Sequence, residues 1–144
     1  VEYLNKKMKI ESQKFAVVLL DIDDFKSIND QYGHIYGDQT LQAFSDSMKK
    51  NMDNKGIVTR FGGEEFMLVF DDINHEVIED TLNKVAEEFA LYGKQSKGIE
   101  LSFSGGVEVF YQEDEIVKLF NRADHKLYYA KHTGKKKIVF DIDV

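Results

Sequence analysis

The sequence predicts one α+β domain with a ferredoxin-like βαββαβ core, in which helices flank a mixed, mostly antiparallel central sheet, plus an extra helix and strand. Three observations predict this fold class. Residues 15–20 form a continuous apolar run, as expected for a buried central strand. Gly62 and Gly63 separate two further apolar runs, which predicts a β-hairpin. Segments with apolar residues at helical spacing lie between the strands.

In chain order the expected elements are strand, helix, two hairpin strands, helix, strand, helix and strand. Residues 1–14 are expected as a lead-in helix from an upstream segment, and residues 15–144 as the domain itself. Asp38 is a candidate N-cap for the first long helix. The expected helices are a short one followed by a loop at 25–37, and longer ones at 38–52, 74–91 and 114–131. After the first strand, the expected strands are 57–61, 66–70, 101–109 and 138–140, with a bulge at Gly105-Gly106. A polar connection is expected at 93–98.

Composition excludes several functional classes. The formal net charge of −7 argues against a broad basic face, so no nucleic-acid partner is expected. No apolar run approaches the roughly 20 residues that span a bilayer, so no membrane contact by this domain is expected. The sequence has no cysteine, which excludes disulfides and thiolate metal sites and fits a cytoplasmic location. Because the chain does not begin with Met, we expect a fragment of a longer protein, whose membrane anchoring stays open.

Acidic residues cluster where the predicted topology brings two strands together. The first and third strands of a ferredoxin-like sheet are central, adjacent and antiparallel, so Asp21 is expected beside Glu64 and Glu65. Carboxylates on a rigid rim suit Mg²⁺, with Mn²⁺ as an alternative. We expect Asp21 and Glu64 as ligands, with the Ile22 carbonyl nearby. Alternatively, the acids at 21, 23 and 24 only end a strand and cap a helix, which is the commoner meaning of an isolated Asp-x-Asp.

Four motifs, in the same order and spacing, resemble those of the GGDEF family of diguanylate cyclase domains. Residues 60–66 (RFGGEEF) resemble the family signature in its GGEEF form. Residues 21–30 (DIDDFKSIND) resemble DxDxFKxIND, and residues 33–38 (GHIYGD) resemble GHxxGD. Residues 123–134 resemble the ADxALYxAKxxG tail, so the likeness covers nearly the whole chain from about Phe15 to Phe140.

The resemblance implies that two GTP molecules condense to cyclic di-GMP with release of pyrophosphate, between two half-sites of a homodimer. It implies Asp21, Glu64 and the Ile22 carbonyl at the metal, and Glu65 as a second ligand or a base. The resemblance implies that Asn29 and Asp38 bind guanine and that Lys26, Lys131 and Lys135 bind the phosphates, with Phe25, Gly62 and Gly63 beside them. Lys26, Glu64 and Glu65 are the implied catalytic residues. Fusion to a sensor or phosphodiesterase domain is a further implication.

Each position also has a simpler explanation. Asp38 can be only an N-cap, Asn29 can close a turn, and Gly62 and Gly63 can serve the hairpin alone. Lys26 and Lys131 can be solvated helix charges, and residues 135–137 can protect an edge strand.

Three departures from the family pattern carry expectations. Residues 53–56 (DNKG) replace the RxxD motif of product inhibition, so we expect no inhibitory product site there. Lys135 stands where arginine is common, which turns a forked phosphate contact into a point charge. Gly105 replaces an aliphatic residue, which should loosen the local packing.

Two alternatives to an active cyclase remain. One is a catalytically idle GTP-binding domain that controls an attached phosphodiesterase or sensor partner. The other is a nucleotidyl cyclase with different product chemistry, against which Asp38 argues because a carboxylate suits guanine.

Overall fold

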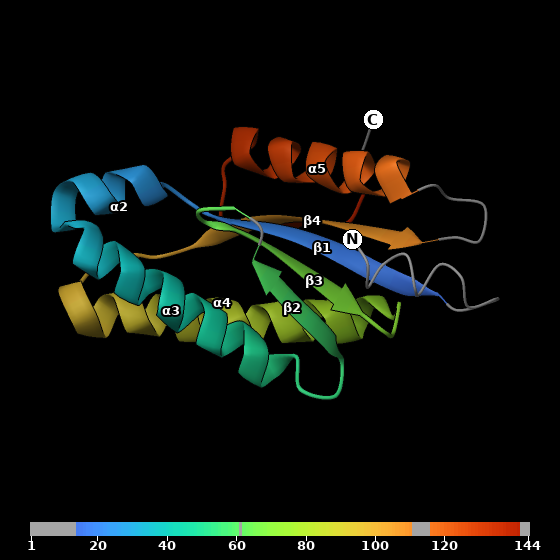
Figure 1. The fold of residues 1–144 in the computed structure, drawn as a ribbon, viewed down its shortest axis with the longest axis horizontal. Coiled ribbons are helices and arrows are strands. Elements are labelled where there is room, and N and C mark those ends of the chain that lie inside the picture. The colour runs from blue at the N-terminus through green and yellow to red at the C-terminus, as the bar shows by residue number, and fades with distance from the viewer. Residues whose placement is uncertain (1–13, 61, 111–115, 142–144) are drawn as a thin grey trace.

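The computed structural model describes residues 14–60, 62–110 and 116–141, which form a five-stranded mixed sheet with helices on both faces. The sheet order is β2-β3-β1-β4-β5, antiparallel except for the parallel β4–β5 pair. In Figure 1, α5 covers one face of the sheet, α3 and α4 cover the other, and α2 lies beyond the end of β1. The elements are β1 (Phe15–Ile22), α2 (Phe25–Tyr32), α3 (His34–Asn51), β2 (Gly56–Arg60), β3 (Glu65–Phe70), α4 (His75–Lys97), β4 (Phe103–Phe110), α5 (Ile116–His132) and β5 (Ile138–Val139).

This architecture confirms the predicted fold class and the predicted hairpin. The expected lead-in helix lies outside the described residues. None of the described helices combines the length and the apolar character needed to cross a membrane.

The central strand β1 is apolar throughout because both of its faces are buried. Ala16, Val18 and Leu20 pack into the core beneath α3 and α4. Val17 and Leu19 pack into a second core beneath α5. The uninterrupted apolar run is therefore a central strand buried on both faces, as the sequence predicts. Its polar end at Asp21 marks where the strand reaches the rim of the sheet.

Two predicted helix boundaries are wrong, one because of the backbone at a glycine and the other because of tertiary packing. α3 begins at His34, directly after Gly33 with its φ of +89°, so Asp38 lies inside the helix and is not its N-cap. α4 continues through the expected connection to Lys97 and ends at Gly98, whose φ is +63°. The helix tolerates Gly93 because a Cβ there would lie 2.7 Å from the Leu101 Cγ atom, so close packing overrides helix propensity.

The predicted bulge at Gly105-Gly106 is also wrong, because β4 pairs with β1 in continuous register through both glycines. The expected loosening of packing at Gly105 is not found. A Cβ on Gly105 would lie 2.5 Å from Leu20 Cδ2 and 2.8 Å from Ile138 Cδ1, so those side chains already fill the space. A Cβ on Gly106 would lie 2.4 Å from the Ala123 carbonyl oxygen, so this glycine sets how closely α5 approaches the sheet.

We predict that Gly106→Ala destabilises the domain by about 2–3 kcal/mol, because the new methyl group meets α5 backbone that cannot rotate away. Urea unfolding measures the change. Gly63→Ala is the matched control, since no heavy atom lies within 4 Å of its added Cβ, and it should change stability by less than about 0.5 kcal/mol. Equal effects of the two substitutions would contradict the role given to Gly106.

Candidate functional site

The antiparallel pairing of β1 with β3 brings the two predicted acidic clusters to one rim of the sheet. Asp21 is the direct Cα partner of Glu65 in the β1–β3 register. The Ile22 backbone N–H donates to the Glu64 carbonyl oxygen over 3.4 Å. Residues more than forty positions apart in the chain are therefore neighbours, as the topology predicts.

The donor set at this rim mixes side chains with backbone. In the described part of the chain, no three His, Cys, Asp or Glu side chains form a metal-binding group. The expected set does not need three, because it combines the Asp21 and Glu64 carboxylates with the Ile22 carbonyl. Mg²⁺ commonly takes one or two protein carboxylates and completes its shell with water and substrate phosphates.

Arg60 holds the glycine turn beside the rim, a role that sequence reasoning missed. Its Nε donates to the carbonyl oxygens of Gly62 at 3.2 Å and Gly63 at 3.1 Å, and its Nη2 donates to that of Gly63 at 2.7 Å. A Cβ on Gly62 would lie 2.7 Å from Glu65 Oε2, so Gly62 makes room for this carboxylate. Nothing lies within 4 Å of the corresponding point at Gly63, which leaves that stretch of backbone open to a ligand.

The electrostatic environment of Asp21 favours a bound cation. The pKa of the Asp21 carboxyl is raised to about 6, chiefly by burial, with the nearby charges of Glu64 and Glu65 acting in the same direction and Lys131 opposing them. A carboxylate this costly to ionise is one that a divalent cation would stabilise.

Lys131 on α5 supplies the one positive charge that the structure shows in contact with Asp21 among the described residues. Its Nζ lies 3.4 Å from Asp21 Oδ1 and donates to the carbonyl oxygens of Asp21 at 3.3 Å and Ile22 at 3.1 Å. The side chain is only 19% exposed. The alternative that Lys131 is a solvated helix charge is therefore wrong.

Asp23, two residues further, is a structural tie and not a free ligand. It is buried, and each of its oxygens accepts two hydrogen bonds. The donors are Ser104 Oγ at 2.7 Å, Ser102 Oγ at 2.7 Å, Lys131 Nζ at 2.9 Å and the Lys136 backbone N–H at 3.0 Å. Burial opposes ionisation, but the bonds from Ser104, Lys131 and Ser102 hold the pKa of Asp23 below its usual range. Sequence reasoning missed this tie, because its partners come from β4, α5 and the segment after α5.

The other two predicted phosphate-binding lysines lie near the same rim and are exposed. Lys135 Nζ donates to Asp24 Oδ1 at 2.6 Å. Lys26 lies in the first turn of α2, beside the half-buried Phe25. Both positive charges are open to solvent, in contrast to Lys131.

The predicted guanine-reading pair meets at the junction of α2 and α3. A Cβ on Gly37 would lie 1.7 Å from Asn29 Oδ1, so the Asn29 amide lies directly against the Gly37 backbone, next to Asp38 in the chain. Asp38 is exposed and lines a cleft of about 410 Å³ with Lys49, Arg60 and Phe66. The cleft therefore joins the start of α3 to the arginine of the signature turn.

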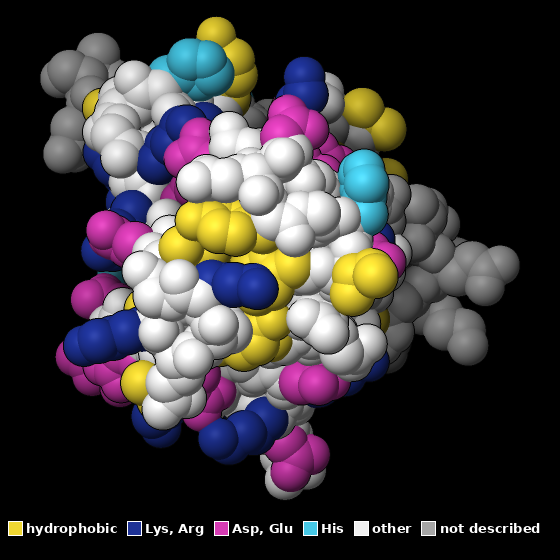
Figure 2. All heavy atoms as spheres, turned by 90° about the vertical axis from the view of Figure 1, so that its left-hand side faces the viewer, with side chains coloured by type: hydrophobic (Ala, Val, Ile, Leu, Met, Phe, Trp, Pro, Cys, Tyr) yellow, Lys and Arg dark blue, Asp and Glu magenta, His cyan; other side chains and the backbone are white. Residues whose placement is uncertain are grey.

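Aromatic packing fixes this junction. Figure 2 looks onto the end of the molecule that carries α2, where hydrophobic side chains surround a basic one. Among the described residues, the Tyr36 ring stacks on Tyr92 at 6.1 Å, its hydroxyl lies 2.7 Å from Ser96 Oγ, and Lys97 Nζ lies 5.6 Å from the ring centre. The first turn of α3 is thereby pinned to the end of α4.

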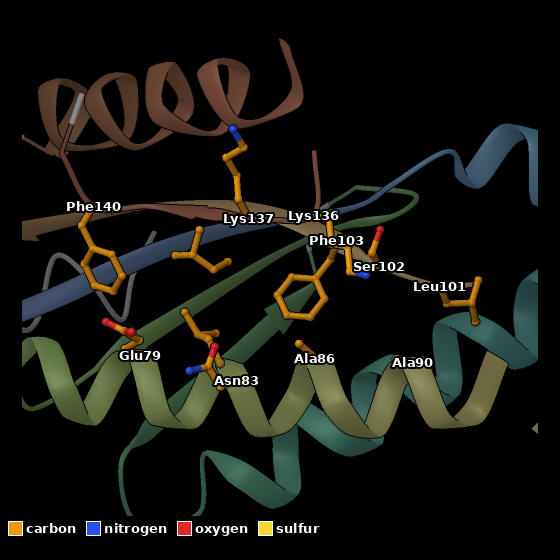
Figure 3. A pocket seen from close by; sticks show the side chains of 12 residues that line it. Glu79, Asn83, Ala86, Ala90, Leu101, Ser102, Phe103, Lys136, Lys137 and Phe140 are labelled. Atoms are coloured by element: carbon orange, nitrogen blue, oxygen red, sulfur yellow. The ribbon is translucent and has the colours of Figure 1, made fainter. Parts of the chain in front are cut away.

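A second cavity lies away from the acidic rim and from the cleft beside Asp38. A pocket of about 270 Å³ opens between α4 and the β4–β5 edge and contains none of the predicted site residues. Figure 3 shows Glu79, Asn83 and Ala86 of α4 across from Phe103 and Phe140, while Lys137 points away towards α5.

The segment 53–56, where the family places its product-inhibition motif, lies in the turn before β2 and at its start. Lys55 Nζ donates to Thr81 Oγ1 at 3.1 Å, and Lys55 lines a cleft together with Asp71 and Asp72. The absence of an inhibitory product site there stays a prediction.

Comparison with known proteins places this geometry in a family. Residues 1–137 match the family model described as "Diguanylate cyclase, GGDEF domain". The diguanylate cyclase DgcP of Pseudomonas aeruginosa is 33% identical over 124 residues, which cover 85% of this chain and 18% of DgcP. An uncharacterized membrane protein of Staphylococcus epidermidis is 33% identical over 143 residues, which cover 96% of this chain and 40% of that protein. The chain thus spans less than half the length of these relatives.

Solved structures agree with the fold. The active GGEEF domain of a diguanylate cyclase from Vibrio cholerae superposes with a TM-score of 0.86 at 26% identity, covering 99% of this chain and 92% of that one. Diguanylate cyclase SiaD from Pseudomonas aeruginosa, solved in complex with its activator SiaC, gives a TM-score of 0.87 at 27% identity over 97% of this chain and 56% of that one. Since the family model matches almost the whole chain and the folds superpose, this chain belongs to the GGDEF family of diguanylate cyclase domains.

Proposed function

We propose that this domain is a catalytically active diguanylate cyclase, which condenses two GTP molecules into cyclic di-GMP and releases pyrophosphate. The observation that carries the proposal is the rim where Asp21, the Ile22 carbonyl and the Glu64 segment meet Lys131. The active form would be a homodimer, because each chain offers one set of these groups. The 3′-hydroxyl of one GTP attacks the α-phosphate of the other, so positioning and electrostatics supply most of the catalysis.

The residues at the rim fit a divalent cation. Asp21 and Glu64 would hold Mg²⁺ or Mn²⁺ with the Ile22 carbonyl, and the pKa of Asp21, raised by burial and then by the charges of Glu64 and Glu65, fits a carboxylate that a cation would stabilise. When bound, the cation neutralises triphosphate charge and lowers the pKa of the attacking hydroxyl. Glu65 lies alongside as a second ligand or a base.

The chain's own cations and polar groups would orient the nucleotide. Lys26, Lys131 and Lys135 lie at or near the rim and would contact the phosphates. The open backbone at Gly63, next to Gly62 in the turn, would permit close approach. Asn29 and Asp38 would read guanine from the junction of α2 and α3, because an amide and a carboxylate match its mixture of acceptors and donors.

The proposal also concerns the longer protein to which this domain would belong. Because the chain covers 40% of one relative and 18% of another, we propose that it works within a longer protein that carries a sensor or phosphodiesterase domain. We propose that the domain lies in the cytoplasm.

The direct test is to incubate dimerised domain with GTP and Mg²⁺ and to detect cyclic di-GMP by chromatography. Asp21→Asn and Glu64→Gln should each lower the rate by about two orders of magnitude, since each removes a ligand of the cation that would offset the negative charge developing in the transition state. Glu100→Gln is the control, because this exposed acid pairs with Lys136 outside the rim. GTP binding without any product would instead favour the idle regulatory alternative.

We predict that Gly37→Ala lowers the affinity for GTP about tenfold and reduces the preference for GTP over ATP, because the new methyl group displaces the Asn29 amide. Stability should not fall, since Ala is favoured over Gly inside a helix by about 1 kcal/mol. Calorimetric titration with both nucleotides measures the change. In an Asn29→Ala background, Gly37→Ala should add no further loss; an equal loss there would contradict the contact.

We predict that Asp21→Asn stabilises the metal-free domain by about 2 kcal/mol at pH 7.5. A carboxyl whose pKa rises on folding, from 3.8 to about 6, binds its proton more tightly in the folded state. Its ionisation therefore costs stability as the pH rises through 6, and the asparagine variant escapes that cost. Urea unfolding in EDTA should show the advantage shrinking below pH 6 and vanishing below about pH 4. An advantage that is independent of pH would contradict this origin.

A further inference from the structure

The ammonium of Lys131 contacts the same oxygens that the proposed metal would use. Its Nζ lies 3.1 Å from the Ile22 carbonyl oxygen and 3.4 Å from Asp21 Oδ1. Mg²⁺ binds oxygen at about 2.1 Å and demands near-octahedral geometry. An ammonium held against two of its ligand oxygens would meet the dication at close range, where like charges repel strongly.

Lys131 is also held by a group outside the proposed metal ligands. Its shortest contact is Asp23 Oδ1 at 2.9 Å, and Asp23 is itself fixed by Ser102, Ser104 and the Lys136 backbone N–H. The side chain is 19% exposed, so solvent offers little competition for these bonds. Asp23 can therefore keep its contact with Lys131 while the ammonium exchanges its contacts with Asp21 and the Ile22 carbonyl.

We infer that Lys131 is a built-in competitor of the divalent metal, which enters fully only when the ammonium turns from Asp21 and the Ile22 carbonyl to the phosphates of an arriving nucleotide. This role of Lys131 rests on the proposed function, because it uses the same ligand set and the same triphosphate. Metal alone then binds weakly, and metal and nucleotide bind with positive coupling, since each relieves a cost that the other would bear.

The neighbouring charges single out Lys131 for this role. Glu64 and Glu65 add negative charge beside Asp21. Lys135 is also close, but its Nζ pairs with Asp24 at 2.6 Å and is more exposed. Removing Lys135 deletes the same charge without freeing a metal ligand, which makes it the matched control.

The test measures Mn²⁺ binding to the nucleotide-free domain by the electron paramagnetic resonance signal of free Mn²⁺. Lys131→Met should bind Mn²⁺ about tenfold more tightly than the wild type, because one opposing charge is gone from the ligand oxygens. Lys135→Met should stay within about twofold of the wild type, because its charge is exposed and screened. Unchanged or weaker Mn²⁺ binding by folded Lys131→Met would overturn the competition.

A second measurement needs no substitution at the rim. In wild-type protein labelled with ¹³C at the lysine Cε atoms, saturation with Mg²⁺ should shift the Lys131 signal. The Lys126 signal should stay in place, because Lys126, more than one helical turn from Lys131 on α5, pairs with Glu108 of β4. A Lys131 signal that does not respond to saturating Mg²⁺ would overturn the inference even if Lys131→Met fails to fold.

Asp21→Asn separates failure of this inference from failure of the proposed function. Loss of Mn²⁺ binding in Asp21→Asn supports the ligand set. If that loss occurs while Lys131→Met gains nothing, the ligand set stands and the competition is wrong. If Mn²⁺ binds Asp21→Asn as well as wild type, the metal site of the proposed function is itself wrong.

Discussion

Antiparallel pairing of β1 with β3, in the register that sets Asp21 opposite Glu65, is the constraint on which the rest of the site depends. Alternation of polar and apolar residues cannot fix this register, because both faces of β1 are buried. On the other side of β1, size complementarity fixes the register with β4. Leu19 pairs with Gly106 and Leu20 with Gly105, and each glycine leaves space that a neighbouring side chain or helix backbone fills. A one-residue slip would set a leucine against Ser104 and leave a void beside a glycine.

Asp21, near the end of β1, and Asp23, just after it, have different roles because their surroundings differ. Asp23 points into a pocket of donors and is fully satisfied, so it serves the fold. Asp21 reaches the rim, where one lysine and two glutamates leave its charge poorly compensated. The same chemistry thus gives a stabilising tie at Asp23 and, at Asp21, a proposed metal ligand whose ionisation costs stability.

Much of this arrangement could be predicted from the sequence, because strand composition and turn residues are local signals. Together they indicate the topology, which brings distant residues together. The continuous run at 15–20, the glycine turn and the convergence of Asp21 with Glu64 all follow from such signals. The missed features depend on contacts between distant segments. Gly93 remains helical because of Leu101, and Gly105 is tightly packed because Leu20 and Ile138 fill its space. Arg60 and Ser102 gain their roles from carbonyl and carboxylate groups whose positions only the folded chain reveals.

The three lysines that we propose as phosphate-binding residues differ in burial, and the difference would give them separate parts in binding. Lys26 and Lys135 are exposed, so their long-range attraction draws an anionic nucleotide towards a domain whose net charge is −7. Salt screens that attraction, since exposed charges interact weakly beyond about 8 Å at physiological ionic strength. Lys131 is buried against Asp21, so it contributes little attraction from a distance until its bonds at the rim are exchanged. In the proposed function, capture by the exposed cations would therefore come first and rearrangement at the half-buried Lys131 would follow, because only a phosphate already in place can replace the oxygens that Lys131 gives up.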